Sequence, residues 1–286
     1  MSMRILFPSS YLYPDRVDMD FVTEYEAAAE TGCEIILIDY DKWVGEEKLV
    51  IRDAPEEECL AVYRGWMLKP DQYKKLYHKL LEDHGMQLVT SPDSYEKLHV
   101  FPNVYPYVKE DTARIRTYSF EDDIQIKEVL KRFPRFMVKD FTKSVKGTSF
   151  PKFFDHTYTQ DAFDEQMQAF YQYRGKLLTG GICIKEYLDL KKYGDATNEF
   201  RVFYMNHVAA TVSRNSNQGV YTPEPPMELI TKYRNLDSLF YTMDFAETAD
   251  GNWKIVEAGD GQMSGLSEGQ DAVAFFRALE RSGIAE

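Results

Sequence analysis

Short apolar runs and segments of helical periodicity alternate along the first third of the chain. Strands are predicted at residues 4–7, 34–39, 60–63 and 87–89, and helices at residues 19–30 and 70–82. Strands that alternate with helices are typical of a parallel α/β unit, which binds ligands beyond the carboxyl ends of its strands. We therefore expect residues 1–95 to form a small open α/β N-terminal domain.

The pattern changes in the rest of the chain, where hairpin signals replace this alternation. Helices are predicted at residues 122–133 and 160–174, and strands at residues 135–140, 182–186, 200–205, 208–214, 239–244 and 253–257. Asn206-His207 and Asp250-Gly251-Asn252 separate consecutive strands and suit hairpin turns, because Asn and Gly tolerate positive φ. This part of the chain is predicted to be α+β with antiparallel sheets.

Composition and charge narrow the classes of protein to which the chain could belong. The chain has 286 residues, 44% hydrophobic and 28% charged, which is ordinary for a globular protein. It holds no apolar run long enough to predict a membrane span. The net charge of −13 disfavours nucleic acid as a partner without excluding it, since a local basic cleft could still attract phosphates. Scattered cysteines, without metal-binding spacing, indicate a reducing cytoplasm.

Two carboxylates flank the predicted turn at residues 250–252. Asp244 and Glu257 are each expected to end a strand of the same hairpin, which would bring them close together. Adjacent carboxylates repel unless a cation lies between them, and Mg²⁺ prefers carboxylate and phosphate oxygens. The glycines that follow, Gly259, Gly261 and Gly265, would let the backbone approach a ligand. A solvated hairpin end with a flexible loop is an equally open interpretation.

Lysines gather in and after the strand predicted at residues 135–140. Lys139 lies within this apolar strand, where a charge is costly to bury unless it meets an anion. The loop that follows carries Lys143 and Lys146 with a glycine and hydroxyl side chains, which suits a loop that closes over phosphates. The loop does not contain the phosphate-binding motif of P-loop nucleotide hydrolases. A basic surface turn remains the alternative.

Two further segments carry candidate ligand-binding groups. The strand predicted at residues 182–186 runs into Lys185, Glu186, Tyr187 and Leu188. Its backbone could meet an adenine edge, with Glu186 available to a ribose or amino group, although a plain polar turn has the same pattern. Arg201 and Arg214 lie on the two arms of the Asn206 hairpin, and they could bind a carboxylate or phosphate or remain surface charges.

The order of these segments resembles the ATP-grasp superfamily, which includes D-alanine–D-alanine ligase and RimK-type ligases. The resemblance covers almost the whole chain. Within the superfamily, the chain looks most like the clade named for one arginine and two lysines. It rests on YRGWM (63–67), SYEKLH (94–99), FMVKDF (136–141), IKEYLDL (184–190), EFRVFYMNHVAATVSR (199–214) and IVEAGDGQMSGL (255–266). It implies a two-lobed ATP-grasp domain at residues 96–286, with a smaller lobe at about 122–185 and a C-terminal lobe at about 186–286.

The resemblance also implies roles on the phosphate and substrate side. Arg64 fits the arginine of the clade and would face the cleft to orient an acidic substrate, packed by Tyr63 and Trp66. Lys97 and Lys139 look like the lysines that hold the ATP phosphates.

On the metal side, Asp244 and Glu257 match the magnesium carboxylates, and Glu186 matches the hinge residue that reads the nucleotide. The chain departs from many relatives at the Glu-x-Asn metal position, where Gly259 replaces the asparagine and Asp260 could supply the missing ligand. Many relatives also carry an arginine at the position of Thr242. In this chain, the positive charge that such an arginine supplies would come from Arg201 or Arg214.

The reaction implied by this resemblance is ATP- and Mg²⁺-dependent and releases ADP. A carboxylate on a small molecule or peptide would become an acylphosphate, and an amine would then displace the phosphate. Two alternatives stay open: an ATP-grasp phosphotransferase or nucleic-acid-modifying enzyme, and a non-catalytic nucleotide-binding module. The sequence names neither the acid, the amine nor the oligomeric state.

Overall fold

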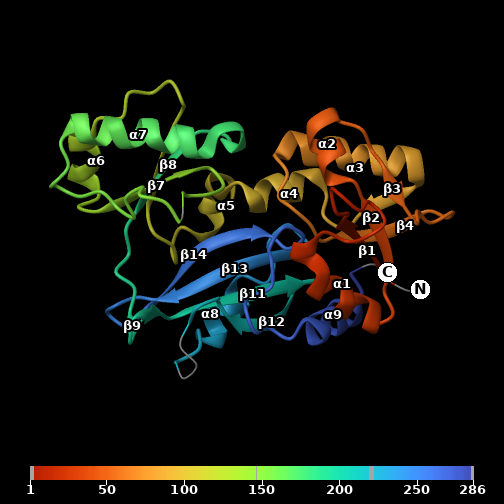
Figure 1. Cartoon of the computed structure of the whole chain (residues 1–286). Coiled ribbons are helices and arrows are strands. Elements are labelled where there is room, and N and C mark those ends of the chain that lie inside the picture. The colour runs from red at the N-terminus through yellow and green to blue at the C-terminus, as the bar shows by residue number, and fades with distance from the viewer. Residues whose placement is uncertain (1–2, 146, 219–221, 285–286) are drawn as a thin grey trace.

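The structure, a computed structural model, describes residues 3–145, 147–218 and 222–284. Three main sheets follow one another along this part of the chain, and helices pack between and around them (Figure 1). No helix within these residues has the length and apolar character that crossing a bilayer requires.

The first sheet is formed by the N-terminal strands in the order β3-β2-β1-β4-β5. Its strands are β1 (Arg4–Pro8), β2 (Glu34–Ile38), β3 (Ile51–Arg52), β4 (Cys59–Tyr63) and β5 (Met86–Leu88), all parallel except the edge strand β3. Its helices are η1 (Met19–Phe21), α1 (Val22–Glu30), α2 (Tyr40–Glu46) and α3 (Pro70–His84). The order reverses between β1 and β4, and Arg64 follows β4 at this point.

The second sheet belongs to the small lobe and is antiparallel in the order β6-β8-β7. The strands are β6 (Ile115–Tyr118), β7 (Phe136–Asp140) and β8 (Ile182–Glu186), and the helices are α6 (Ile126–Arg132), α7 (Gln160–Arg174) and η2 (Gly175–Leu177). Phe136, Val138 and Ile184 are buried in one core with side chains of α6 and α7. Since side chains alternate along a strand, Lys139 and Lys185 point to the opposite face.

The third sheet has the order β12-β11-β13-β14 and is antiparallel throughout. Its strands are β11 (Glu199–Met205), β12 (Val208–Arg214), β13 (Phe240–Glu247) and β14 (Trp253–Asp260); β9 (Lys192–Tyr193) and β10 (Ala196–Thr197) form a short hairpin before them. One face packs on α1 and α9 (Ala272–Arg281), and the other on α4 (Pro92–His99), α5 (Phe101–Val108) and α8 (Met227–Lys232). Asn206 and His207 both have positive φ, as a type I′ hairpin turn requires.

The predicted combination of an open α/β sheet with antiparallel sheets is confirmed. Five α-helices were not predicted: α2, α4, α5, α8 and α9. The boundary expected between residues 95 and 96 falls inside α4, whose Leu98 packs against the third sheet. The expectation that Asp244 and Glu257 end their strands is wrong, because β13 and β14 continue past both residues.

Candidate active site

Two buried lysines lie side by side on the open face of the small-lobe sheet. Lys185 pairs with Met137 and Lys139 pairs with Cys183 across β7 and β8, so the two lysines are diagonal neighbours on one face. Both side chains are nearly enclosed, with Lys185 5% and Lys139 8% exposed. The Lys185 ammonium donates to the carbonyl of Val256 on β14 at 2.7 Å, which brings this face against the edge of the third sheet.

Burial and mutual repulsion make this lysine pair electrostatically costly. Burial lowers the pKa of Lys185 to about 7, and the positive charge of Lys139 contributes to the same shift. Ammonium groups are expensive to bury without an anion. The pair is therefore a place where a polyanion such as a nucleotide phosphate would be stabilised.

The start of the lysine loop is held by Asp140, a residue that the sequence did not single out. Its buried carboxylate accepts hydrogen bonds from the backbone N–H groups of Thr142 (2.8 Å) and Lys143 (2.7 Å), and it pairs with Arg174 of α7 at 2.7 Å. An aspartate that bonds its own backbone two residues onward is the signal that could have predicted this turn. Lys146, a predicted phosphate ligand, lies outside the described residues.

Arg201, Asp244 and Glu257 form a row across three neighbouring strands of the third sheet. Arg201 pairs with Asp244 and Asp244 with Glu257, so all three side chains share a face. The Arg201 guanidinium holds both oxygens of Asp244, with Nε–Oδ1 at 2.8 Å and Nη2–Oδ2 at 2.7 Å, and also donates to the carbonyl of Gly265. Asn215 donates to Asp244 Oδ2 at 3.1 Å.

Glu257 connects this row to the lysines of the small lobe. Its Oε1 lies 3.6 Å from the Lys143 ammonium and 3.8 Å from that of Lys139. These are ion-pair distances longer than a hydrogen bond. The structure therefore brings together, from two lobes, the predicted lysines Lys139, Lys143 and Lys185 and the predicted carboxylates Asp244 and Glu257.

Asp260 does not join that group. It lies three residues beyond Glu257 on β14, pairs with Tyr241 and is fully buried beside the N-terminal domain. Its Oδ1 accepts from the backbone N–H of Gln262 at 3.0 Å, while Oδ2 has no hydrogen-bond partner among the described residues, and burial raises the pKa of the carboxyl to about 7. Within the same residues, no cluster of three metal-binding side chains is present. The expected place of Asp260 beside the other two carboxylates is therefore wrong.

Arg64 is also placed differently from the expectation that it faces a cleft. It is 1% exposed, and its guanidinium forms two hydrogen bonds with Glu24 of α1, at 2.7 and 2.8 Å. It also donates to the carbonyls of Gly261 and Ser264. Arg64 thus ties the N-terminal sheet to the glycine-rich loop after β14. Within that loop, Gly261 packs so closely on Phe240 that a Cβ would come within 2.6 Å of the ring.

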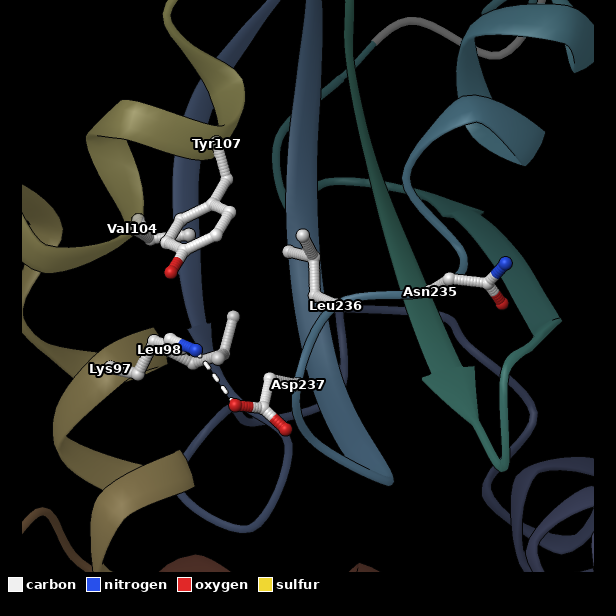
Figure 2. A pocket seen from close by; sticks show the side chains of 7 residues that line it. All are labelled: Lys97, Leu98, Val104, Tyr107, Asn235, Leu236 and Asp237. Atoms are coloured by element: carbon white, nitrogen blue, oxygen red, sulfur yellow. Dashed lines mark hydrogen bonds and ion pairs between the residues drawn. The ribbon is translucent and has the colours of Figure 1, made fainter.

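Lys97 lies apart from Lys139, on the outer side of α4. It lines a hollow of about 100 Å³ between α4, α5 and the loop before β13 (Figure 2). Its ammonium pairs with Asp237 at 2.7 Å and lies 4.9 Å from the centroid of the Tyr107 ring. The helix turns Leu98 inward and Lys97 outward, so the second lysine beside Lys139 is Lys185 and not Lys97.

The predicted hinge residues connect the small lobe to the third sheet. Glu186 is engaged by Arg114 at 2.6 and 2.9 Å, and this hydrogen bonding lowers the pKa of its carboxyl. Tyr187 donates its N–H to the carbonyl of Arg135 at 3.0 Å, and Leu188 follows, half-buried. In the structure, the Glu186 carboxylate is therefore already hydrogen-bonded to Arg114.

Arg214 lies on the face of the third sheet opposite to Arg201. It pairs with Phe200 across β11 and β12, its guanidinium stacks 4.9 Å from the centroid of that ring, and it donates to the carbonyl of Thr222 at 2.9 Å. The expectation that both arginines serve one site is therefore wrong.

Solved structures of known proteins share this fold. The RimK domain ATP-grasp protein of Sphaerobacter thermophilus superposes with a TM-score of 0.62 at 16% identity, covering 99% of both chains. The D-cycloserine synthetase DcsG gives 0.60 at 15% identity, covering 99% of this chain and all of its own. The ATP-grasp ligase PsnB, complexed with a variant of its minimal precursor, Mg and ADP, gives 0.60 at 12% identity, with coverage of 99% and 97%.

These likenesses define an ATP-grasp fold, with the small α/β domain and two lobes that the sequence resemblance implied. Residues 126–279, more than half of the chain, match the model of an ATP-grasp domain family, the third family of the clade named for one arginine and two lysines, and the chain belongs to that family. A search of curated proteins found no match. Lys139, Lys185, Asp244 and Glu257 all lie within the matched segment, whereas Arg64 and Lys97 lie outside it.

Proposed function

We propose that this chain is an ATP- and Mg²⁺-dependent ligase that activates a substrate carboxylate as an acylphosphate and joins it to an amine, releasing ADP. The observation that carries the proposal is the meeting of two buried lysines from the small lobe with two carboxylates from the third sheet. Two of the similar ATP-grasp structures are the ligase PsnB, complexed with the precursor peptide PsnA2, and the D-cycloserine synthetase DcsG. They support a small-molecule or peptide acid as the substrate class.

The side chains present fit a nucleotide polyphosphate. Lys139 and Lys185 are buried cations side by side, and Lys143 reaches the same place from the loop. Phosphoryl transfer depends on positioning and charge neutralisation more than on covalent help, so these ammonium groups would hold the phosphates in line. The backbone after Glu186 would meet the adenine, since the Glu186 side chain is held by Arg114.

The carboxylates fit a magnesium ion in part. Glu257 is partly open and offers hard oxygen ligands, while Asp244 is held by Arg201 and would share its oxygens with the ion. Bound magnesium would neutralise charge on the phosphate oxygens. Arg201 is the remaining cation of this row and would steady the substrate carboxylate or the acylphosphate.

The test is a Mg²⁺-dependent ATP turnover assay with mixed amino acids and peptides, with the nucleotide products separated and hydroxylamine added to trap acylphosphate as a hydroxamate. ADP, phosphate and hydroxamate together support the ligase. AMP and pyrophosphate would overturn the ADP-forming reaction. A phosphorylated product that forms without any amine would identify the phosphotransferase alternative.

A second candidate, a nucleotide-binding module without turnover, is favoured by one observation. Ala258 and Gly259 follow Glu257 where relatives carry a further ligand, and Asp244 has both oxygens occupied by Arg201. The unmodified chain and Glu257→Gln together separate the two candidates: a ligase turns over ATP and loses turnover in the variant while ATP still binds, whereas the module binds ATP without turnover in both. Turnover close to that of the unmodified chain would contradict the metal assignment.

A further inference from the structure

The Lys185 ammonium is buried without the partner that a buried cation usually has. An ammonium has three N–H donors, and the carbonyl of Val256 accepts one of them. Among the described residues, none of the carboxylates lies within ion-pair distance of Lys185. The neighbouring charge of Lys139 is repulsive, and the smaller attraction of the Glu257 carboxylate offsets it only in part. Some other group must help keep this ammonium in place.

The ring of Phe101 occupies that position. Its centroid lies 4.0 Å from the Lys185 ammonium and 5.9 Å from that of Lys139. Phe101 is 3% exposed, so ring and ammonium meet where water is largely excluded. The negative face of an aromatic ring attracts a cation most strongly under these conditions.

The backbone fixes this ring relative to the lysines. Phe101 opens α5, and its N–H donates to the carbonyl of Phe141 at 2.8 Å, just after the strand that carries Lys139. The side chain belongs to the same core as Leu98 and Val104. Phe101 therefore reaches the lysines from outside the segment that matches the family.

We propose that Phe101 is a positioning residue for the phosphate-binding lysines, holding the Lys185 ammonium by its ring face without neutralising it. A carboxylate at this place would hold the ammonium more strongly but would cancel the charge that a phosphate must meet. A ring attracts the cation and leaves its charge available. The inference deepens the proposed function and rests on it for the identity of the anion.

The test replaces Phe101 by mono-, di- and trifluorinated phenylalanine, which withdraw electron density from the ring face step by step with little change in shape. The affinities for ATP and for adenosine are measured by calorimetry. We expect ATP affinity to fall stepwise, by about tenfold at the last step, with adenosine affinity unchanged. A merely structural role would weaken both ligands or neither. The same series at Phe170, a small-lobe core ring that packs on Phe150, controls for the size of fluorine.

A second readout does not depend on nucleotide. The ring should shift the NMR signals of the Lys185 ε-protons upfield, and Phe101→Leu should remove that shift; Lys185→Arg assigns the signal. ATP binding that is equally tight across the fluorinated series, or ε-protons at ordinary positions in the unmodified chain, would overturn the inference. An upfield signal in a chain that does not bind ATP would instead overturn the proposed function and leave the ring contact standing.

Discussion

Replacing Asp260 by asparagine tests whether this carboxylate is a buried structural group or a metal ligand. The carboxyl is fully buried, and burial raises its pKa from 3.8 to about 7 against the opposing influence of the Gln262 N–H and the Arg64 charge. The buried hydroxyl of Thr90 faces this carboxyl and also opposes the rise in its pKa, although Oδ2 makes no hydrogen bond of normal geometry among the described residues. An amide at residue 260 would keep Oδ1 as the acceptor for Gln262, carry no charge and add a donor.

The sign of the effect follows from where the proton is bound. Below pH 3.8 the Asp260 carboxyl is protonated in the folded and the unfolded chain. Between 3.8 and about 7 the unfolded chain releases the proton while the folded chain keeps it, so the free energy of unfolding falls as the pH rises. This loss of unfolding free energy is complete above pH 7. Raising the pKa of the carboxyl from 3.8 to about 7 then costs the folded chain about 4 kcal/mol.

We therefore expect Asp260→Asn to stabilise the chain by up to about 4 kcal/mol at about pH 8, and by much less near pH 4. The assay is urea unfolding across this range, followed by tryptophan fluorescence and far-UV circular dichroism, whose coincidence tests two-state behaviour. Asp111→Asn is the matched control of opposite sign. Hydrogen bonds from Lys232 and Tyr233 outweigh burial and lower the pKa of the Asp111 carboxyl, so this variant should lose stability at neutral pH.

Two results would refute the reasoning. If Asp260→Asn destabilises the chain, and does so more at about pH 8 than near pH 4, the carboxylate is charged in the folded state and stabilised by its surroundings. If the variant keeps its stability but loses Mg²⁺-dependent ATP turnover, Asp260 is a metal ligand, as the sequence suggested.

Three further predictions concern the lysines and Arg64. Lys97→Ala should leave the affinity for ATP within about twofold of the original, whereas Lys185→Ala should lower it at least tenfold, as measured by calorimetry. Lys185 is charged below its pKa of about 7, so the affinity for ATP should fall as the pH rises past 7. At about pH 8, ATP binding should be coupled to the uptake of a proton. Calorimetry in buffers of different ionisation enthalpy measures this uptake. Glu24→Gln should cost about 3–5 kcal/mol of unfolding free energy because it leaves Arg64 buried without its partner. Its control, Glu34→Gln at an exposed ion pair, should cost at most about 1 kcal/mol.

Strand periodicity and turn chemistry were sufficient to predict most of the sheets. The apolar runs and the turns at Asn206 and Gly251 are local features, and the hairpins that they predict are present. Helix α5 could not be predicted in this way, because Pro106 lies inside the helix, where proline ordinarily breaks it. Its formation depends on packing of Phe101 and Val104 against the third sheet, a contact between distant parts of the chain.

A single β-bulge explains why Arg214 was misplaced. The turn at residues 206 and 207 pairs Met205 with Val208, and an unbroken register would pair Arg214 with Glu199, on the same face as Arg201. The register shifts between Phe203 and Tyr204, so Arg214 pairs with Phe200 and points to the other face. Nothing in the local sequence marks this bulge. The positions of Arg64 and Lys97 likewise depend on Glu24 and Asp237, which are remote in sequence.

The division of charge between the two sides of the site explains how an acidic chain could hold a polyphosphate. The small lobe contributes Lys139, Lys143 and Lys185. The third sheet contributes Glu257 and the ion pair between Arg201 and Asp244. The pair is neutral in sum, and one carboxylate does not balance three ammonium groups, so the site carries a local positive surplus despite the net charge of −13. Since Glu257 lies beyond hydrogen-bond distance of the Lys139 and Lys143 ammonium groups, a phosphate with its cation could insert between them without breaking a hydrogen bond to either ammonium. Nucleotide and magnesium should then bind cooperatively, because each relieves the charge that the other leaves unbalanced.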